Sequence, residues 1–134
     1  MYRKASIRPF QSEDEPLLFG LASIGRGADE RTLSVLERET VFVAEVDGSA
    51  AGYVALDAGE RELCIDQLFV SPDHEAEGVG RQLLEYAEGY AISRGATTLR
   101  VVVSEEDERA VRFYRGRGFV PAGDDLLELV LPRP

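Results

Sequence analysis

The chain has 134 residues, of which 44% are hydrophobic and 30% are charged. Because domains most often contain roughly 100–150 residues, we expect residues 1–134 to form one domain with a hydrophobic core. The 25 acidic residues outnumber the 15 basic ones, and the resulting net charge of −10 argues against a nucleic-acid-binding surface. No run approaches the ~20 apolar residues that span a bilayer, and none follows the basic start, so the sequence predicts a cytoplasmic protein that binds no membrane.

Cysteine, histidine and lysine are scarce, and the scarcity of the first two excludes two kinds of site. One cysteine and one histidine cannot form an internal disulfide or a structural zinc site, so we expect no metal. Only Lys4 is a lysine, and the other fourteen basic residues are arginines. Such an acidic, lysine-poor composition is typical of proteins from salt-loving organisms, and a GC-rich genome produces the same preference for arginine.

The N-terminal third predicts one strand and two helices. Residues 2–8 alternate as a first strand that ends at Pro9. A helix over 12–23 follows, with Ser12 as N-cap and Glu15 at the spacing of a capping box. A second helix is expected over 28–39.

Three strands follow. Residues 41–46 and 51–56 are rich in β-forming residues and are joined through Asp47-Gly48, which is a strong hairpin pattern. A further short turn leads to a fourth strand over 61–70.

The second half is more regular. Gly78 to Arg94 carries apolar residues on one helical face, and Gly95 ends the helix. We expect a buried strand over 97–103, a short helix over 104–116 and two last strands at 119–120 and 126–131. The complete order indicates an α/β (α+β) domain in which helices flank a mixed sheet.

The stretch from Asp66 to Leu84 is the most informative. It places a strand, a turn marked by Pro72, a glycine-bearing loop and a helix in that order. A helix that begins in such a loop directs unpaired N–H groups outward and can bind a phosphate. Side chains at Gly78 and Gly80 would hold the anion away from the backbone. A simple helix start remains the alternative interpretation.

This stretch and a second motif resemble those of the GNAT superfamily of N-acetyltransferases. The second motif follows about thirty residues later and reads Asp-Glu-Arg-Ala-Val-Arg-Phe-Tyr-Arg-Gly-Arg-Gly-Phe over 107–119, where the family has Asn-x-x-Ala-x-x-(apolar)-Tyr-x-x-x-Gly-Phe. The opening over residues 7–10 and the order of elements across the chain are also similar. The resemblance implies the GNAT fold, a mostly antiparallel mixed sheet of about seven strands with about four helices and a V-shaped opening between strands 4 and 5.

The resemblance also implies acetyl-CoA as co-substrate in that opening. The backbone of the fourth strand would pair with the pantetheine arm, the glycine loop and the next arginine would hold the pyrophosphate, and the second motif would line the same side. The residues assigned in this way are Leu68, Phe69, Val70, Glu75, Ala76, Glu77, Gly78, Val79, Gly80, Arg81, Asp107, Ala110 and Phe113. For Asp107, an acid that offsets the dipole at a helix start is the alternative.

The implied reaction is direct attack of an amine on the thioester, without an acyl-enzyme. Tyr114 matches the family position that protonates the departing thiolate, and its alternative is a buried packing role. An amine nucleophile needs a base. Counting by twos puts Glu62, Cys64 and Asp66 on one strand face if no bulge intervenes, which makes Asp66 the first candidate base and Glu62 the second. Solvated carboxylates are the alternative, and Cys64 is expected to pack.

The loop departs from the family pattern, because Glu75 stands where the family has a cationic or amide residue and Glu77 adds a second carboxylate. The sequence therefore leaves two functions open. One is an acyl-CoA-dependent N-acyltransferase that acts on a small-molecule or peptide amine, and the other is a degenerate domain that binds acyl-CoA or a protein partner without catalysis. A homodimer is also compatible with the family.

Overall fold

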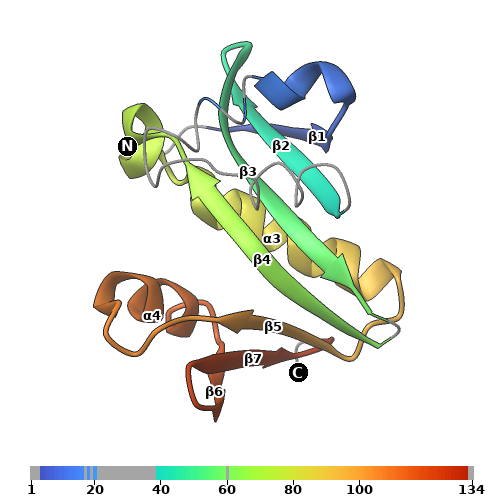
Figure 1. Cartoon of the computed structure of the whole chain (residues 1–134), viewed down its shortest axis with the longest axis vertical. Helices are drawn as coiled ribbons and strands as arrows, with labels where there is room; N and C mark the ends of the chain where they lie inside the picture. The colour runs from blue at the N-terminus through green and yellow to red at the C-terminus, as the bar shows by residue number, and fades with distance from the viewer. Residues whose placement is uncertain (1–3, 17, 19, 21–38, 60, 133–134) are drawn as a thin grey trace.

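A computed structural model describes residues 4–16, 18, 20, 39–59 and 61–132. The described residues form a seven-stranded sheet in the order β1-β2-β3-β4-β5-β7-β6, which confirms the predicted α/β sheet (Figure 1). In chain order the elements are β1 (Ser6–Pro9), the 3-10 helix η1 (Ser12–Asp14), β2 (Thr40–Val46), β3 (Ser49–Ala58), β4 (Glu62–Val70), the 3-10 helix η2 (Pro72–Glu77), α3 (Val79–Ser93), β5 (Thr98–Val102), α4 (Glu108–Arg115), β6 (Val120–Gly123) and β7 (Leu126–Val130).

The sheet is mixed because β4 and β5 run parallel, whereas the other described neighbours pair antiparallel. A parallel pair needs a crossover, and η2 and α3 supply it. The β4–β5 register ends at the pair Ile65 and Val101, although β4 continues to Val70. The two strands therefore separate toward their carboxyl ends, as Figure 1 shows.

The β2–β3 hairpin confirms the turn predicted at Asp47-Gly48. Both turn residues have positive φ, 52° and 80°, and Val46 pairs directly with Ser49. These angles fit the two-residue type I′ turn, whose twist matches that of the flanking strands.

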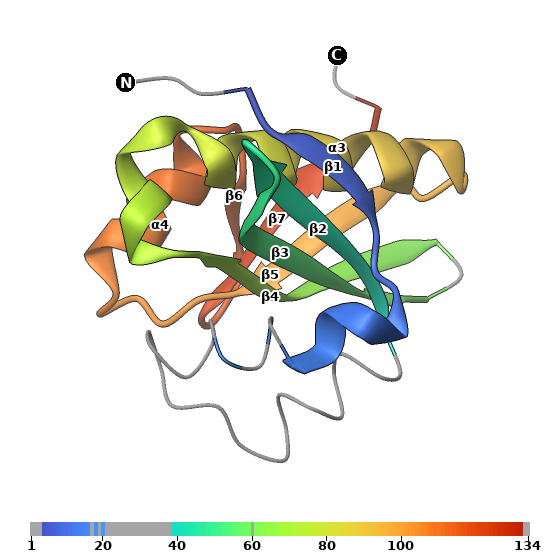
Figure 2. The same ribbon diagram turned by 90° about the horizontal axis from the view of Figure 1, so that it is seen from above.

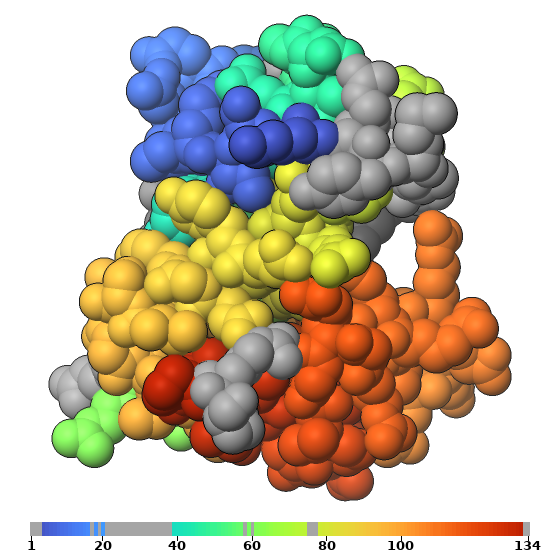
Figure 3. Space-filling model, turned by 180° about the vertical axis from the view of Figure 1, so that it is seen from behind, coloured from blue at the N-terminus to red at the C-terminus, as the bar shows by residue number. Residues whose placement is uncertain are grey.

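Helix α3 buries the face that the sequence predicts, which consists of Val79, Leu83, Leu84, Ala87 and Ala91. Gly95, at φ 76°, ends the helix as expected. The Ala96 N–H donates to the Ala91 carbonyl and the Gly95 N–H to the Ile92 carbonyl, which is the Schellman pattern. Viewed from behind, α3 lies between the N-terminal and C-terminal parts of the chain (Figure 3).

Hydrophobic side chains pack on both faces of the sheet. The larger cluster lies between the sheet and α3 with α4, and includes Leu63, Leu83 and Tyr114. A smaller cluster on the opposite face gathers Leu18, Val41, Val43, Tyr53 and Ala55. Figure 2 shows α3 and α4 on one side of the sheet and the helical turn after η1 on the other. No helix in the described ranges is both long and apolar enough to span a bilayer.

The start of the first helix differs from the sequence prediction by one residue. The N-cap is Gln11, whose N–H donates to Asp14 Oδ2 at 2.8 Å, so the box predicted for Ser12 and Glu15 is wrong. Asp14 fills the acidic position because both its carboxylate oxygens also accept from Arg8, each at 2.8 Å. The Arg8 guanidinium holds the pKa of this carboxyl below its ordinary value.

Two other predicted boundaries shift as well. The first strand begins at Ser6 rather than at residue 2, and residues 1–3 lie outside the described part. Helix α4 begins at Glu108 rather than at Ser104, because residues 104–107 form a turn in which the Asp107 N–H donates to the Ser104 carbonyl at 2.9 Å. The helix predicted over 28–39 lies outside the described residues except for Glu39.

Candidate functional site

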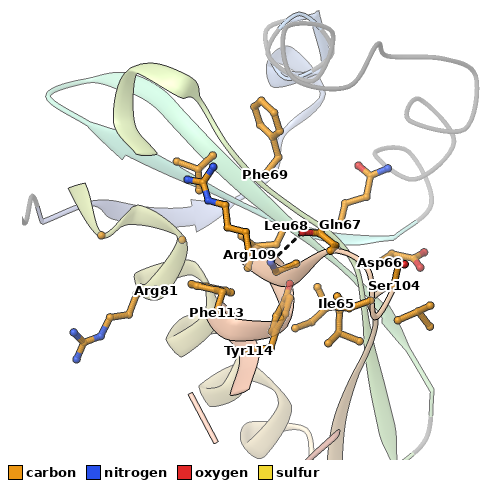
Figure 4. Close-up of a pocket in the computed structure, with 18 residues that line it drawn as sticks. Ile65, Asp66, Gln67, Leu68, Phe69, Arg81, Ser104, Arg109, Phe113 and Tyr114 are labelled. Atoms are coloured by element: carbon orange, nitrogen blue, oxygen red, sulfur yellow. Dashed lines mark hydrogen bonds between the residues drawn. The ribbon is translucent and has the colours of Figure 1, made fainter. Parts of the chain in front are cut away.

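A pocket of about 770 Å³ opens where β4 and β5 separate. Its lining comes from four places along the chain: β4 contributes residues 65–70, the start of α3 contributes Gly78, Gly80 and Arg81, the end of β5 and the next two residues contribute 101–104, and α4 with its N-cap contributes Asp107, Arg109, Ala110, Phe113 and Tyr114 (Figure 4). The volume lies within the range of roughly 300–1,000 Å³ that is usual for small-molecule sites.

A bulge in β4 at Asp66 divides the strand at the pocket. Gln67 pairs with Ala55 of β3, whereas Ile65 pairs with the next residue, Leu56, so Asp66 is the extra residue. The sequence predicted that Glu62, Cys64 and Asp66 share a face only if the strand has no bulge. The bulge at Asp66 means that this condition is not met. Beyond the bulge, Phe69 contacts the smaller cluster while Leu68 and Val70 pack on the larger one.

The bulge coincides with the end of β4–β5 pairing, which leaves one edge of β4 open. The Ser71 N–H donates to the Ala51 carbonyl at 2.7 Å. Because hydrogen-bonding directions alternate along an antiparallel pair, Leu68 and Val70 direct their backbone N–H and C=O groups away from β3 and into the opening. The predicted Leu68, Phe69 and Val70 thus all line the pocket.

The glycine loop forms another wall. Gly78, at φ 79°, is the left-handed residue between η2 and α3, and both Gly78 and Gly80 line the pocket. A Cβ on Gly80 would lie 3.4 Å from Val70 Cγ2, 3.6 Å from Phe113 Cζ and 3.7 Å from Leu68 Cδ2. Gly80 therefore keeps a space open that a larger side chain would fill.

The remaining predicted loop residues divide into two groups. Val79 is fully buried in the core and lies outside the pocket lining. Arg81 lines the pocket, but its side chain is exposed, hydrogen-bonds Glu85 at 3.1 Å and points away from the pocket in Figure 4. Glu75, Ala76 and Glu77 form the end of η2 immediately before Gly78, and their side chains lie outside the described part.

Helix α4 presents aromatic side chains to the opening. Its N-cap, Asp107, accepts from the Ala110 N–H at 3.2 Å, so Asp107 has the capping role that the sequence offered as an alternative and also lines the pocket. Tyr114 is 6% exposed and contacts the rings of Phe113 and Phe119 edge-on, at centroid distances of 5.0 and 5.4 Å. In Figure 4 its phenol points toward β4.

The two candidate bases lie in different places. Asp66 is exposed at the pocket. Glu62 lies in a second hollow with Cys64 and pairs at 3.1 Å with Arg100, which also binds Glu128 at 2.7 Å. Burial, followed by nearby carboxylates, raises the pKa of the Cys64 thiol, which therefore stays protonated.

Several lining residues were not predicted from the sequence, namely Ile65, Gln67, Val101, Val102, Val103, Ser104 and Arg109. Ser104 precedes the second motif, and Arg109 stands inside it at a position where the family pattern specifies no residue. Gln67 was missed because strict alternation places it on the core face, whereas the bulge turns it to the face of Tyr53. The Tyr53 hydroxyl donates to Gln67 Oε1 at 2.6 Å.

The pocket thus brings together three kinds of polar group. Backbone donors on β4 face a buried phenol on α4, and a carboxylate lies beside them. Such donors stabilise the negative charge that develops on an attacked carbonyl.

Comparison with known proteins agrees with this geometry. Residues 5–119 match the model of the acetyltransferase (GNAT) family. An uncharacterized N-acetyltransferase of Archaeoglobus fulgidus is 39% identical over 58% of this chain and 58% of its own length. Streptothricin acetyltransferase of Streptomyces lavendulae is 36% identical over 75% of this chain and 50% of its own length. The chain thus spans about half the length of the curated relatives it matches.

Solved structures share the fold at lower identity. The ribosomal-protein-S18-alanine N-acetyltransferase of Escherichia coli superposes with a TM-score of 0.85, covering 98% of this chain and 96% of its own, at 21% identity. At that identity the likeness shows the fold alone. The family match covers most of the chain, and its two motifs meet in the pocket between β4 and α4, so the chain belongs to the acetyltransferase (GNAT) family.

Proposed function

We propose that this chain is an N-acetyltransferase that transfers acetyl from acetyl-CoA to an amine by direct attack. The observation that carries the proposal is the open edge of β4 beyond Ile65, which shares one pocket with Gly80 and Tyr114. A transferase needs a place for an extended acyl carrier and a group that protonates its leaving atom, and this pocket combines both features.

The pocket fits an acyl-CoA. The backbone groups of Leu68 and Val70 that face the opening can pair with the amides of a pantetheine arm as an added strand would. The N-terminal turn of α3 offers backbone N–H groups and a positive dipole to the pyrophosphate. Gly78 and Gly80 let those phosphates approach the backbone.

Three residues then share the chemistry. Asp66, directly or through a water, accepts the proton of the attacking amine. The Val70 N–H polarises the thioester carbonyl, because it faces the opening. Tyr114 donates its phenolic proton to the departing thiolate. Its phenol lines the pocket and points toward β4, where the thioester would lie.

The acceptor is proposed to be a small molecule or a peptide that carries a free amine. The names of similar proteins support this range, since one relative is named for streptothricin and one structural neighbour for the alanine of ribosomal protein S18. We place the reaction in the cytoplasm.

Calorimetric titration with acetyl-CoA, followed by a thiol-release assay over a panel of amines, tests the proposal. Binding together with amine-dependent thiol release is the expected result. Binding without release from any amine would favour the non-catalytic alternative. The absence of acetyl-CoA binding at both low and high salt would contradict the proposed function altogether.

A further inference from the structure

The side chain of Gln67 has no place in the proposed mechanism, yet it lines the pocket next to Asp66. The bulge at Asp66 turns Gln67 onto the face of Tyr53 and Phe69, opposite the face on which Leu68 and Val70 meet the larger core. In Figure 4 it extends away from Phe113 and Tyr114. Gln67 therefore lies on the side of β4 that remains for the acceptor once the acyl carrier occupies the side of Tyr114.

A buried phenol fixes the orientation of the Gln67 amide. Tyr53 is 1% exposed and donates its hydroxyl proton to Gln67 Oε1 at 2.6 Å. The tilted ring of Phe69, with its centroid 5.9 Å from that of Tyr53, packs beside this pair. Because Oε1 accepts from Tyr53, the Nε2 group lies on the opposite side of the Cγ–Cδ bond, within the same plane. Among the described residues, Nε2 makes no hydrogen bond.

A carboxamide held in this way presents two N–H donors and thus selects an oxygen as its partner. Gln67 is next to Asp66 in the chain, which limits the distance between the acceptor's amine and the oxygen that Gln67 binds. That oxygen must lie close to the amine that Asp66 deprotonates. A carbonyl on the carbon that bears the amine meets this requirement. The Asp66 carboxylate disfavours a second negative charge beside it, so a neutral carbonyl fits better than a free carboxylate.

We propose that Gln67, oriented by Tyr53, binds the carbonyl oxygen of an α-amino carbonyl acceptor, so that the enzyme prefers an amino amide or a peptide N-terminus to a plain alkylamine. This inference rests on the proposed N-acetyltransferase function and deepens it. Gln67 acts as a specificity residue, and Tyr53 is a positioning residue that acts through it.

The test compares alaninamide with isopropylamine, which replaces the carboxamide by a methyl group. L-Alanine and the dipeptide Ala-Ala extend the panel, and all rates are compared at equal concentrations of free base because the amine pKa values differ. The wild type should favour alaninamide by at least about tenfold in kcat/KM, since a site built to donate a hydrogen bond rejects an analogue that lacks the acceptor. Ala-Ala should follow alaninamide, and L-alanine should be poorer.

Three variants assign the preference to Gln67. Gln67→Glu keeps the oxygen that binds Tyr53 but replaces the N–H donors. The ratio of kcat/KM for alaninamide to that for isopropylamine should therefore fall close to one. Tyr53→Phe should reduce it partly, through a higher KM for alaninamide. If Gln67→Glu fails to fold, Gln67→Met removes the donors without adding charge and carries the same expectation.

Matched controls are Gln11→Glu and Tyr86→Phe, at exposed positions away from the pocket, which should keep the preference. Acetyl-CoA affinity should stay unchanged in every variant. Equal use of both amines by the wild type, or an unaltered preference in Gln67→Glu, would overturn the inference and leave the transferase function intact. Acetyl-CoA binding with no acetylation of any amine would instead remove the proposed function, and the inference with it.

Discussion

The two halves of β4 lie in one strand but have different surroundings. Residues 62–65 pair with β5 on one side, and residues 63–65 also pair with β3 on the other. Residues 67–70 pair only with β3 among the described strands, and they line the pocket together with the bulge residue Asp66. The first half uses its backbone hydrogen bonds to hold the sheet together, whereas the second half leaves one edge without a partner among the described strands.

Side chains follow the same division. In the first half the polar Glu62 binds Arg100 across to β5, and Leu63 and Ile65 fill the core. In the second half the bulge at Asp66 reverses the alternation and brings Gln67 to the opening. The loss of one strand partner, rather than a change in composition, thus gives the second half of β4 an open edge.

Tyr114→Phe should have the largest effect on the proposed reaction at the open half. The variant keeps the ring and its contacts with Phe113 and Phe119 but loses the proton for the departing thiolate. Turnover should fall by about 10²–10⁴-fold, the range typical of lost acid–base catalysis, with little change in acetyl-CoA affinity. Steady-state kinetics together with calorimetry measure both quantities, and Tyr86→Phe on the exposed side of α3 is the control. Unchanged turnover would assign Tyr114 to packing.

A matched pair of carboxylate variants compares the two halves directly. Asp66→Asn in the open half should lower turnover by about 10²-fold, the low end of the acid–base range, since an exposed base can be replaced in part by water. Glu62→Gln in the paired half should cost at most about 1 kcal/mol of unfolding free energy, the usual worth of an exposed ion pair, and leave turnover unaffected. Kinetics and thermal melts read out the two variants. Equal losses of turnover would contradict the division of β4.

Gly80→Val tests the wall opposite the open edge. Its Cβ would meet Val70, Phe113 and Leu68 at 3.4 to 3.7 Å, and the added methyl groups would enter the pocket. We expect acetyl-CoA affinity to fall by at least about tenfold while the melting temperature stays the same or rises slightly, because valine is a better helix former than glycine by a few tenths of a kcal/mol.

Gly89→Val is the control for this loss of affinity, since a Cβ on Gly89 meets nothing within 4 Å. If Gly80→Val bound acetyl-CoA with wild-type affinity, the glycine loop would be only a helix start. The proposed cofactor site would then be contradicted.

The sequence predicted most of the fold because local patterns decide it. The Asp47-Gly48 turn, the buried face of α3 and the Gly95 end follow from residue types whose conformational preferences need no distant partner. The boundaries that shifted depend on distant contacts. Asp14 rather than Glu15 fills the acidic position of the first helix start because Arg8 of β1 reaches it.

The candidate site was predictable only in part for the same reason. Motif positions such as Tyr114, Gly78 and Gly80 could be identified from the resemblance to the family motifs, and the structure brings them into one pocket. Gln67 could not, because a bulge is a property of two paired strands and leaves no period in either one. The Glu62 assignment depended on the same missing information, and its side chain lies in a different hollow with Arg100.

The smallest expected effect concerns salt and the loop that follows the open half of β4. Glu75 and Glu77 stand immediately before Gly78, where a bound pyrophosphate would lie near both. A unit charge about 7 Å from a phosphate costs roughly 0.5–2 kcal/mol, and at ~1 M salt the Debye length of ~3 Å removes most of that cost. Acetyl-CoA affinity should therefore rise by about two- to tenfold between 0.1 and 2 M KCl, a modest gain because the same salt screens the attraction of the α3 dipole.

The double variant Glu75→Gln/Glu77→Gln should bind acetyl-CoA more tightly at low salt and lose the rise in affinity with salt. The control Glu105→Gln/Glu106→Gln removes two exposed charges outside the pocket lining and should retain that rise. Titration calorimetry across the salt series decides the matter, and a steady fall of wild-type affinity with salt would show that attraction, not repulsion, dominates at this loop.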